Sequence, residues 1–192
     1  MCNCDLPWPE LAVPAGLDEA ALRRVVSGGP RLVWGEGFLS AGLGLIMDNP
    51  GLREDRDGVP FVCPTRQTLR QALRQAGVAE QDVQVFFLYK ARPRRAYDRQ
   101  AANALYLPIL QEQVHLSSAK VLLGLGDTVL RAMFGEDAAV RTMRGRWQTF
   151  CDLPLLASYH PLAARRRPNL GPLLVQDIAM AWTRLRQGGP ET

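Results

Sequence analysis

An apolar run at 43–47 ends in the sequence Asp-Asn-Pro-Gly at 48–51, which brings polar side chains to the end of a predicted strand. The carboxylate of Asp48 can accept a proton or offset a positive charge, whereas the amide of Asn49 has no useful basicity and can only orient water through its carbonyl oxygen. Loop capping is the alternative role for Asp48, because aspartate is common beside turns. Such an abrupt stop indicates that the strand presents these side chains at its end.

His160 follows another apolar run, in the sequence Ser-Tyr-His-Pro at 158–161, and is one of two histidines in the chain. The other, His115, lies in or after a predicted helix and has no motif around it.

Arginines form three groups, namely Arg92, Arg94, Arg95 and Arg99; Arg141, Arg144 and Arg146; and Arg165, Arg166 and Arg167. Solvated surface arginine explains any one group alone, but three groups in successive loops favour a polyanionic partner.

Four short apolar runs have the length and the Val, Leu and Phe content of strands buried on both faces. They lie at 43–47, 83–89, 120–125 and 154–159. Helical patterns lie between and around them, at 17–26, at 65–77, at 98–114, after Asp127 and in the closing segment through Trp182 and Leu185. This alternation predicts an α/β fold, a three-layer α/β/α sandwich with a central, mostly parallel four-stranded sheet. Ligands of such sheets bind outside the carboxyl ends of the strands, where the polar residues gather.

The predicted helices carry their own start and stop signals. The pattern at 65–77 places Leu69, Leu73 and Ala76 on one side and Arg66, Arg70 and Arg74 on the other. Asp98, Asp127 and Asn169 are predicted to cap helices, and Gly135 to end one. Pro108 is predicted to kink or shorten the helix that begins after Asp98.

Composition fits one domain over 1–192, with 1–30 as an N-terminal extension and helix. The chain has 192 residues, 47% of them hydrophobic, which suffices for a core of its own. No apolar stretch approaches the roughly 20 residues of a membrane helix, and residues 1–10 lack signal-peptide features, so a soluble, cytoplasmic protein is expected. The four cysteines, Cys2, Cys4, Cys63 and Cys151, are irregularly spaced and predict free thiols rather than a disulfide framework or paired metal site.

Six short stretches together resemble the uracil-DNA glycosylase superfamily, especially its iron-sulfur, family 4-like branch. They are GEG (35–37), LGLIMDNPGLREDRDGVPF (43–61), KARP (90–93), LLGLGDTVL (122–130), RG (144–145) and SYHP (158–161). The resemblance covers roughly residues 31–182, and its most specific part is the P-G-x-x-E-D-x-x-G-x-P-F pattern.

The resemblance implies a monofunctional DNA glycosylase of base excision repair, which extrudes a uracil or other deaminated base and hydrolyses its N-glycosidic bond. It implies that Asn49 handles the water with Asp48 in support, and that His160 donates to O2 of the base as charge accumulates there. Phe61 matches the aromatic residue that stacks on the flipped base. Packing in the core beneath the loop is the alternative role for Phe61.

Several positions depart from the pattern of the family. The asparagine that reads the Watson–Crick edge of uracil aligns with Phe87, which has no hydrogen-bonding group in its side chain; if the alignment shifts by one or two residues, Phe87 is an ordinary core residue. A family glycine corresponds to Met47 and a small residue to Leu162, and both changes would narrow or reshape the pocket. Base choice therefore stays open between uracil and other deaminated bases.

The cysteines that hold the iron-sulfur cluster in the family are replaced as well. One corresponds to Ala91 and the next falls near Asn103, so no cluster, metal or other cofactor is predicted. Packing by the helix that contains Leu105 and Leu110 is the expected substitute for the stability that a cluster gives.

The resemblance also implies the partner, which is DNA containing damaged bases. Arg165, Arg166 and Arg167 would bind phosphates from the loop that the family inserts into the duplex, and Leu162 is the candidate wedge, unless it packs beneath the loop. The expected protein is a monomer that does not associate with membranes.

Two other functions remain open. A catalytically inactive DNA-binding homologue is favoured by Phe87, Met47 and Leu162, and a small-ligand protein is supported only by the strand-end cleft. The enzymatic hypothesis requires that the turns holding Asn49 and His160 face each other across a hollow large enough for an unstacked base.

Overall fold

The computed structural model describes residues 11, 16, 18, 20 and 22, and residues 32–52, 64–93 and 97–188. Within these residues one sheet holds six strands in the order β1-β3-β2-β4-β6-β5. The strands are β1 Gly35–Gly37, β2 Leu43–Met47, β3 Val83–Phe87, β4 Val121–Leu125, β5 Trp147–Phe150 and β6 Leu153–Ser158. The four inner strands run parallel, and β1 and β5 pair antiparallel at the two edges.

The four predicted strands are confirmed as β2, β3, β4 and β6, but the prediction of a four-stranded sheet is wrong because two edge strands extend it. The sequence of β1 is Gly-Glu-Gly, which has no apolar residue to indicate a strand. β5 is short, and of its four residues one is buried. Edge strands of this kind form through pairing with a neighbour rather than through a pattern of their own.

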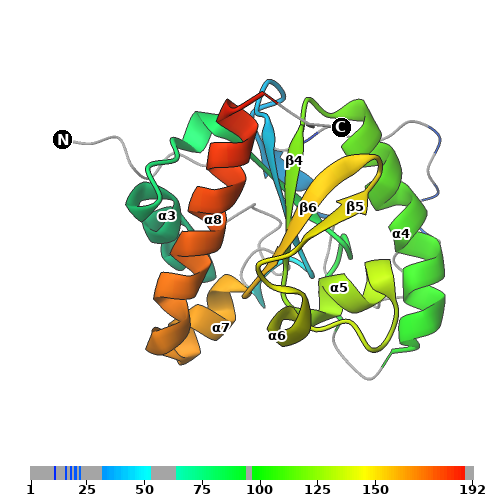
Figure 1. The fold of residues 1–192 in the computed structure, drawn as a ribbon. Coiled ribbons are helices and arrows are strands. Elements are labelled where there is room, and N and C mark those ends of the chain that lie inside the picture. The colour runs from blue at the N-terminus through cyan, green and yellow to red at the C-terminus, as the bar shows by residue number, and fades with distance from the viewer. Residues whose placement is uncertain are drawn as a thin grey trace.

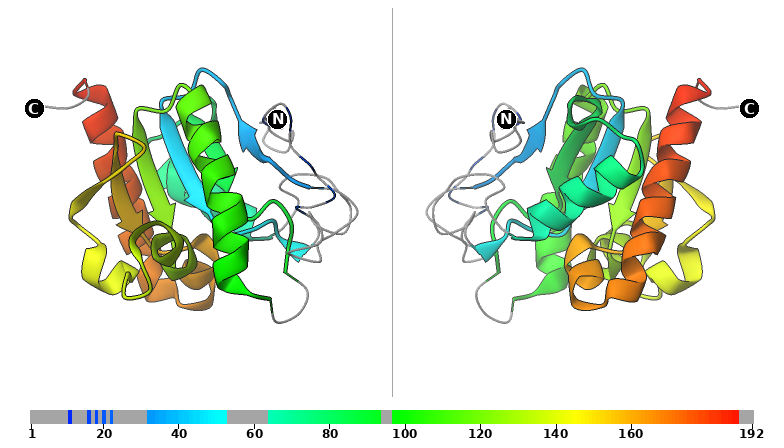
Figure 2. Two further views of the ribbon diagram at one scale, coloured as in Figure 1. Left: turned by 90° about the vertical axis from the view of Figure 1, so that its right-hand side faces the viewer. Right: turned by 90° about the vertical axis from the view of Figure 1, so that its left-hand side faces the viewer.

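Helices cover both faces of the sheet and produce the predicted three layers (Figures 1 and 2). The helices described are α3 Pro64–Gln75, α4 Arg99–Leu116, α5 Asp127–Phe134, α6 Val140–Met143, α7 Pro161–Arg166 and α8 Gly171–Arg186. In Figure 1, α3 and α8 lie on one side of the strands, and α4 and α5 lie on the other. The short α7 lies at the end of the sheet where β6 stops.

Neighbouring residues of each inner strand enter two different hydrophobic cores. Leu45 packs in the core beneath α3 and α8, whereas Ile46 packs in the core beneath α4 and α5. Val85 and Phe86 divide in the same way in β3. Burial on both faces explains why these strands appear in the sequence as continuous apolar runs instead of alternating patterns.

Two of the predicted helix signals are confirmed. Asp98 caps α4, because its carboxylate accepts from the backbone N–H groups of Gln100 and Ala101 at 2.9 and 3.1 Å. Gly135 ends α5 with φ at 99°, a conformation that favours glycine.

Two other predictions about the helices are wrong, and of the two effects predicted for Pro108 the shortening does not occur. Asp127 is the first residue of α5 rather than its cap, and its carboxylate accepts from the Val140 backbone N–H at 2.8 Å, which ties α5 to α6. Asn169 lies in a 3₁₀ turn, Pro168–Leu170, that runs directly into α8 without a side-chain cap. Pro108 does not shorten α4, which continues to Leu116. Buried residues on both sides of the proline hold the two halves together, among them Tyr106, Ile109 and Leu110.

The predicted helix at 17–26 and the extension 1–30 lie largely outside the described residues, as do Phe61, Cys2, Cys4 and Cys63. His115 is exposed near the end of α4.

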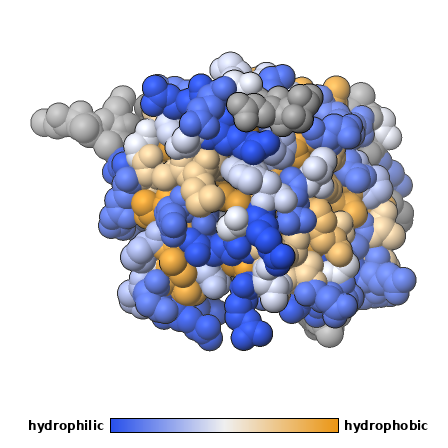
Figure 3. Space-filling model, in the orientation of Figure 1, coloured by the Kyte–Doolittle hydropathy of each residue, from blue (hydrophilic) through white to orange (hydrophobic). Residues whose placement is uncertain are grey.

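The surface shown in Figure 3 is mostly hydrophilic, with hydrophobic side chains in separate patches. Across the described ranges, every helix is too short or too polar to cross a membrane.

Candidate active site

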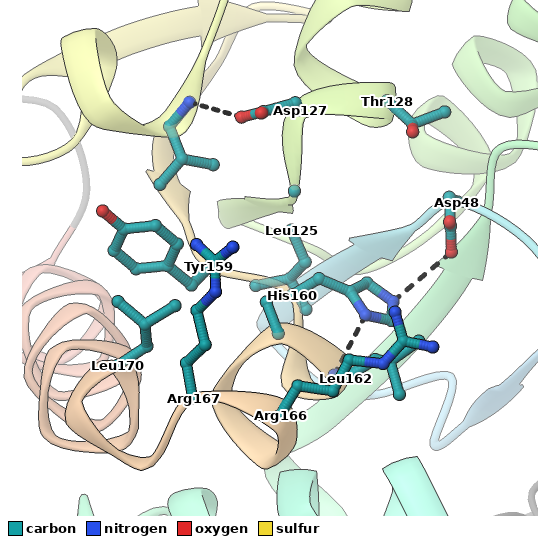
Figure 4. Close-up of a pocket in the computed structure, with 13 residues that line it drawn as sticks. Asp48, Leu125, Asp127, Thr128, Tyr159, His160, Leu162, Arg166, Arg167 and Leu170 are labelled. Atoms are coloured by element: carbon teal, nitrogen blue, oxygen red, sulfur yellow. Dashed lines mark hydrogen bonds and ion pairs between the residues drawn. The ribbon is translucent and has the colours of Figure 1, made fainter.

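Asp48 and His160 come together at the carboxyl edge of the sheet (Figure 4). Asp48 directly follows β2, and His160 comes two residues after β6; β4 lies between these two parallel strands. The Nε2 atom of His160 lies 3.3 Å from Oδ1 of Asp48. The two residues are 112 positions apart in sequence, so the parallel order of the strands is what brings them into contact.

A backbone contact fixes which side of the imidazole faces Asp48. The Leu162 N–H donates to Nδ1 of His160 at 3.1 Å, and His160 is thereby the N-cap of α7. Because Nδ1 is an acceptor, a neutral ring carries its proton on Nε2. His160 therefore directs an N–H group toward the carboxylate of Asp48.

The surroundings of Asp48 favour its ionised form. Burial by itself raises the pKa of Asp48, but the hydrogen bond and charge of His160, together with the Asn49 backbone N–H at 2.8 Å, outweigh burial and lower the pKa below its ordinary value. Asp48 is thus both a turn-capping residue and the partner of His160. Asn49 lies beside it, and its Nδ2 donates to the Pro50 carbonyl at 2.7 Å.

Gly126 provides the space that His160 occupies. It follows β4, and its N–H donates to the Ser158 carbonyl at 2.9 Å, which joins the ends of β4 and β6. Its φ is 96°, and a Cβ atom added there would lie 3.1 Å from Cβ of His160. A side chain at this position would therefore be strained and would press on the imidazole.

Asn49 and His160 both line a cavity of about 160 Å³, named the inner cavity. Its walls include Met47, Asp48, Asn49, Arg66, Phe87 and His160. A cavity of about 150 Å³ in another protein binds benzene, so this volume suits a six-membered ring. Phe87 and Met47 are buried and form part of the wall without filling the space. The hollow that the enzymatic hypothesis requires is present.

A second, wider cavity of about 420 Å³, named the outer cavity, lies next to the inner one. Asp48, His160 and Leu162 line both. Arg166 and Arg167 line the outer cavity from α7, with Arg166 extending toward the side of His160 and Arg167 toward Tyr159 in Figure 4. This cavity combines two exposed cations with direct access to the Asp48–His160 pair.

The three arginines predicted to act together diverge in the structure. Arg165 and Arg166 belong to α7 and Arg167 is its C-cap, so they lie on a helix rather than on the predicted loop. Arg165 lines a different groove, between α3 and α8, with Gln71 and Pro172. Because a helix turns about 100° per residue, consecutive side chains cannot share one direction. Leu162, the predicted wedge, is half-buried and lies between the two cavities.

Arg66 lines the inner cavity, so the prediction that it lies on the side of its helix opposite Leu69 and Leu73 is wrong. It is buried, and its Nη2 lies 2.6 Å from Oε1 of Glu36 in β1. The signal that could have found it is the i, i+3, i+7 spacing that Arg66 shares with the buried Leu69 and Leu73. Its partner lies in a strand that the sequence did not reveal.

A polar network supports the segment that carries His160. Ser158 Oγ donates to Oδ2 of the buried Asp177 at 2.6 Å, and Arg144 Nε donates to the same oxygen at 2.7 Å. Burial raises the pKa of Asp177, and Arg144 and Ser158 offset only part of that rise. The network joins the end of β6 to α8 two residues before His160.

The two described positions that the resemblance assigns to cluster cysteines do not fit thiolate ligation. Ala91 is buried with a methyl side chain, and Asn103 accepts a 2.6 Å hydrogen bond from the Tyr89 hydroxyl. The Tyr89 ring packs edge-to-face on Tyr97 and on Tyr106, and its centroid lies 5.6 Å from that of Tyr97 and 5.8 Å from that of Tyr106.

Among the residues that the structure describes, His, Cys, Asp and Glu nowhere gather in a group of three able to hold a metal. Cys151, the described cysteine, lies in the turn between β5 and β6.

Comparison with known proteins identifies the family of the chain. Residues 36–186 match the uracil DNA glycosylase superfamily. The type-4 uracil-DNA glycosylase of Pyrobaculum aerophilum is 31% identical over 157 residues, which cover 76% of this chain and 79% of that protein. The type-4 uracil-DNA glycosylase of Thermotoga maritima is 27% identical over 168 residues, which cover 82% and 85%. That of Sulfurisphaera tokodaii is 29% identical over 155 residues, which cover 75% and 70%. The chain therefore belongs to the uracil DNA glycosylase superfamily.

Proposed function

We propose that this protein is a monofunctional DNA repair glycosylase that hydrolyses the N-glycosidic bond of uracil, or of another deaminated base, extruded from DNA. The observation that carries the proposal is the Asp48–His160 pair at the edge of a cavity that suits a six-membered ring. Membership of the superfamily and relatives named uracil-DNA glycosylases support the same activity.

The proposed reaction separates charge, and the site has a group for each sign. The base leaves as an anion while the sugar passes through a cation-like state. The Asp48 carboxylate can offset the positive charge on the sugar, and the carbonyl oxygen of Asn49 can orient the water that attacks it. The His160 Nε2–H faces Asp48 when no base is bound, and it would turn to a carbonyl oxygen of the base once the base enters, while Nδ1 stays engaged by the Leu162 N–H.

The outer cavity is the proposed site for the DNA backbone. Arg166 and Arg167 are exposed beside the inner cavity, so phosphates flanking an extruded nucleotide would lie near both. Leu162, between the two cavities, is the proposed residue that fills the vacated stack. Phe61 is retained as a proposed stacking residue and lies outside the described residues. Action as a monomer is part of the proposal.

We further propose that the protein works without an iron-sulfur cluster. The methyl group of Ala91 and the amide of Asn103 support this, because neither can replace a thiolate. The three packed tyrosines then supply stability at this place. Iron and sulfide analysis of the purified protein, with its visible absorbance spectrum, tests the proposal. Stoichiometric iron that persists after the chain is purified without added metal would contradict it.

The test of the main function is release of bases from duplex and single-stranded oligonucleotides that contain uracil, hypoxanthine or xanthine. Wild type should produce abasic sites with at least one of these bases. His160→Ala and Asp48→Asn should lose most of this activity while they retain DNA binding, whereas Lys120→Met, an exposed change at the opposite edge of the sheet, should retain both. Absence of abasic sites with every base would reject the proposal.

A catalytically inactive DNA-binding homologue is the second candidate. It is favoured by the apolar Phe87 and Met47 in the wall of the inner cavity, which offer no hydrogen bonds from their side chains to a base. This candidate predicts salt-sensitive DNA binding that His160→Ala leaves unchanged, together with no base release by wild type.

A further inference from the structure

The inner cavity has a buried cation in its wall at the side of α3. Arg66 is 3% exposed and lines the cavity together with Phe87 and His160. Its guanidinium is held by Glu36, which is 0% exposed, at 2.6 Å. Because α3 supplies the arginine and β1 supplies the glutamate, the position of the guanidinium is fixed by two separate elements.

A guanidinium offers hydrogen-bond donors and no acceptor. It carries five N–H groups in a planar fork, so it can bond Glu36 and a second acceptor at the same time. Phe87, in the same wall, has neither donor nor acceptor in its side chain. Thr65, next to Arg66 on α3, also lines the cavity, and its hydroxyl can donate or accept. Arg66 is therefore the group on this side that offers donors without an acceptor.

Deamination changes the edge of a base in the way that such a wall can detect. Cytosine and adenine present exocyclic amino groups, which are donors, whereas the carbonyl that replaces each amino group is an acceptor. A donor facing an amino group leaves two buried donors without an acceptor, which is costly. A donor facing a carbonyl forms a charge-assisted hydrogen bond, and this bond strengthens as the departing base becomes an anion.

We propose that Arg66, held in place by Glu36, is the residue that selects deaminated bases, by donating to the carbonyl that deamination creates. The proposal rests on the glycosylase function proposed above and assigns its base specificity to a residue outside the Asp48–His160 pair. It also accounts for how a site with Phe87 in its wall can discriminate between bases.

Electrostatics keep Arg66 charged in this buried place. Burial lowers the pKa of Arg66 to about 10, and the charge of Glu36 counteracts part of this effect. The guanidinium therefore remains protonated at neutral pH. Glu36 accordingly acts as a positioning residue: it keeps the cation in the wall and neutralises it when no base is present.

The experiment compares uracil with pyrimidin-2-one, a base that lacks the carbonyl at position 4, in otherwise identical oligonucleotides. Because a single substitution would leave a buried charge unpaired, the test variant is the double change Glu36→Leu and Arg66→Met, since apolar replacement of both members of a buried pair is often neutral for folding. Arg66→Lys retains the positive charge but loses the planar arrangement of N–H groups that lets a guanidinium bond Glu36 and a base together. Arg74→Met, on an exposed position of the same helix, is the matched control.

Wild type and Arg74→Met should release uracil with a kcat/KM about 10- to 100-fold above that for pyrimidin-2-one, which corresponds to one charge-assisted hydrogen bond. The double variant, with folding checked by its thermal transition, should release both bases at similar rates, and Arg66→Lys should lie between. An unchanged ratio in the folded double variant would overturn the role of Arg66 and leave the glycosylase function standing. No release of any base by wild type would overturn both.

Discussion

Asp48 has two contacts whose strengths depend on its charge. The Asn49 backbone N–H and the His160 Nε2 both face Oδ1 of Asp48, so one carboxylate oxygen shapes the turn and orients the imidazole. A single protonation event would weaken both contacts together. The proposed chemistry of the site requires Asp48 to be ionised, and its surroundings favour that state by lowering its pKa.

Asp48→Asn should lower kcat for base release by about 10²- to 10⁴-fold, with little change in KM, because the amide keeps the shape but loses the charge. The contacts of Asp48 lower its pKa, so wild-type activity should persist as the pH falls and decline only below the ordinary range of an aspartate. Steady-state rates from neutral to acidic pH measure both effects.

The matched comparison for Asp48→Asn is Asn49→Ala. If Asn49 only orients water, its loss should lower kcat and leave the acid limb of the pH profile in place, whereas Asp48→Asn should remove that limb. A pH profile of Asp48→Asn that keeps the wild-type acid limb would contradict the role given to the carboxylate.

Lys90 is a second residue whose ionisation bears on the whole fold. It is 0% exposed, and burial lowers its pKa to about 7. Its Nζ donates to the Phe87 carbonyl and to Gln113, and Gln113 in turn donates to the Trp34 carbonyl at 3.2 Å. The amine thus links the end of β3 to α4, outside the inner cavity.

The free energy of unfolding should rise between pH 7 and about pH 10, because over this range the unfolded chain binds a proton at Lys90 that the folded chain has released. The slope from this one residue should approach about 1.4 kcal/mol per pH unit. Urea unfolding of Lys90→Met at several pH values should lack this rise. Lys120→Met removes the other, exposed lysine and should keep it; parallel curves for wild type and Lys90→Met would refute the assignment.

At the scale of elements, the inner strands and two of the predicted caps followed from the sequence because their signals are local. Continuous apolar runs identified β2, β3, β4 and β6, and their parallel order brought Asp48 and His160 to one edge. β1 stayed hidden because Gly-Glu-Gly forms a strand only by pairing with β3. The spacing within α3 places Arg66 on the face of Leu69 and Leu73, but without β1 nothing indicated the Glu36 carboxylate that makes the burial of this arginine possible.

The network of Asp177, Arg144 and Ser158 is the element that holds the His160 segment. Asp177→Ala should lower the free energy of unfolding by about 3 kcal/mol, because Arg144 and the buried Ser158 hydroxyl both lose their acceptor. Ser158→Ala leaves the Arg144–Asp177 pair intact and should cost about 1 kcal/mol. Urea unfolding measures both, and equal losses in the two variants would show that Arg144 contributes nothing through Asp177.

At the scale of the whole molecule, Asp48, Asn49 and His160 lie at the carboxyl ends of parallel inner strands of the sheet. β2 brings Asp48 and Asn49, β6 brings His160, and α7 continues from the same edge with its arginines. The net charge is only +4, so the proposed attraction to DNA would depend on where the arginines lie rather than on their number. In the proposed function, Arg166 and Arg167 beside the outer cavity would act on the same DNA strand whose base enters the inner cavity.

Arg166→Ala and Arg167→Ala should each reduce the slope of log K against log salt concentration by about 0.9, because each side chain would neutralise one phosphate near the extruded nucleotide. Arg165→Ala removes the same charge from a side chain that lines the groove between α3 and α8, and should reduce the slope less. Fluorescence anisotropy of a uracil-containing duplex at a series of salt concentrations measures all three. Because the three variants have identical net charge, a difference among their slopes reports position alone. Equal reductions would mean that the DNA extends across α7 to the α3 side, and the outer cavity would then no longer define the path of the strand.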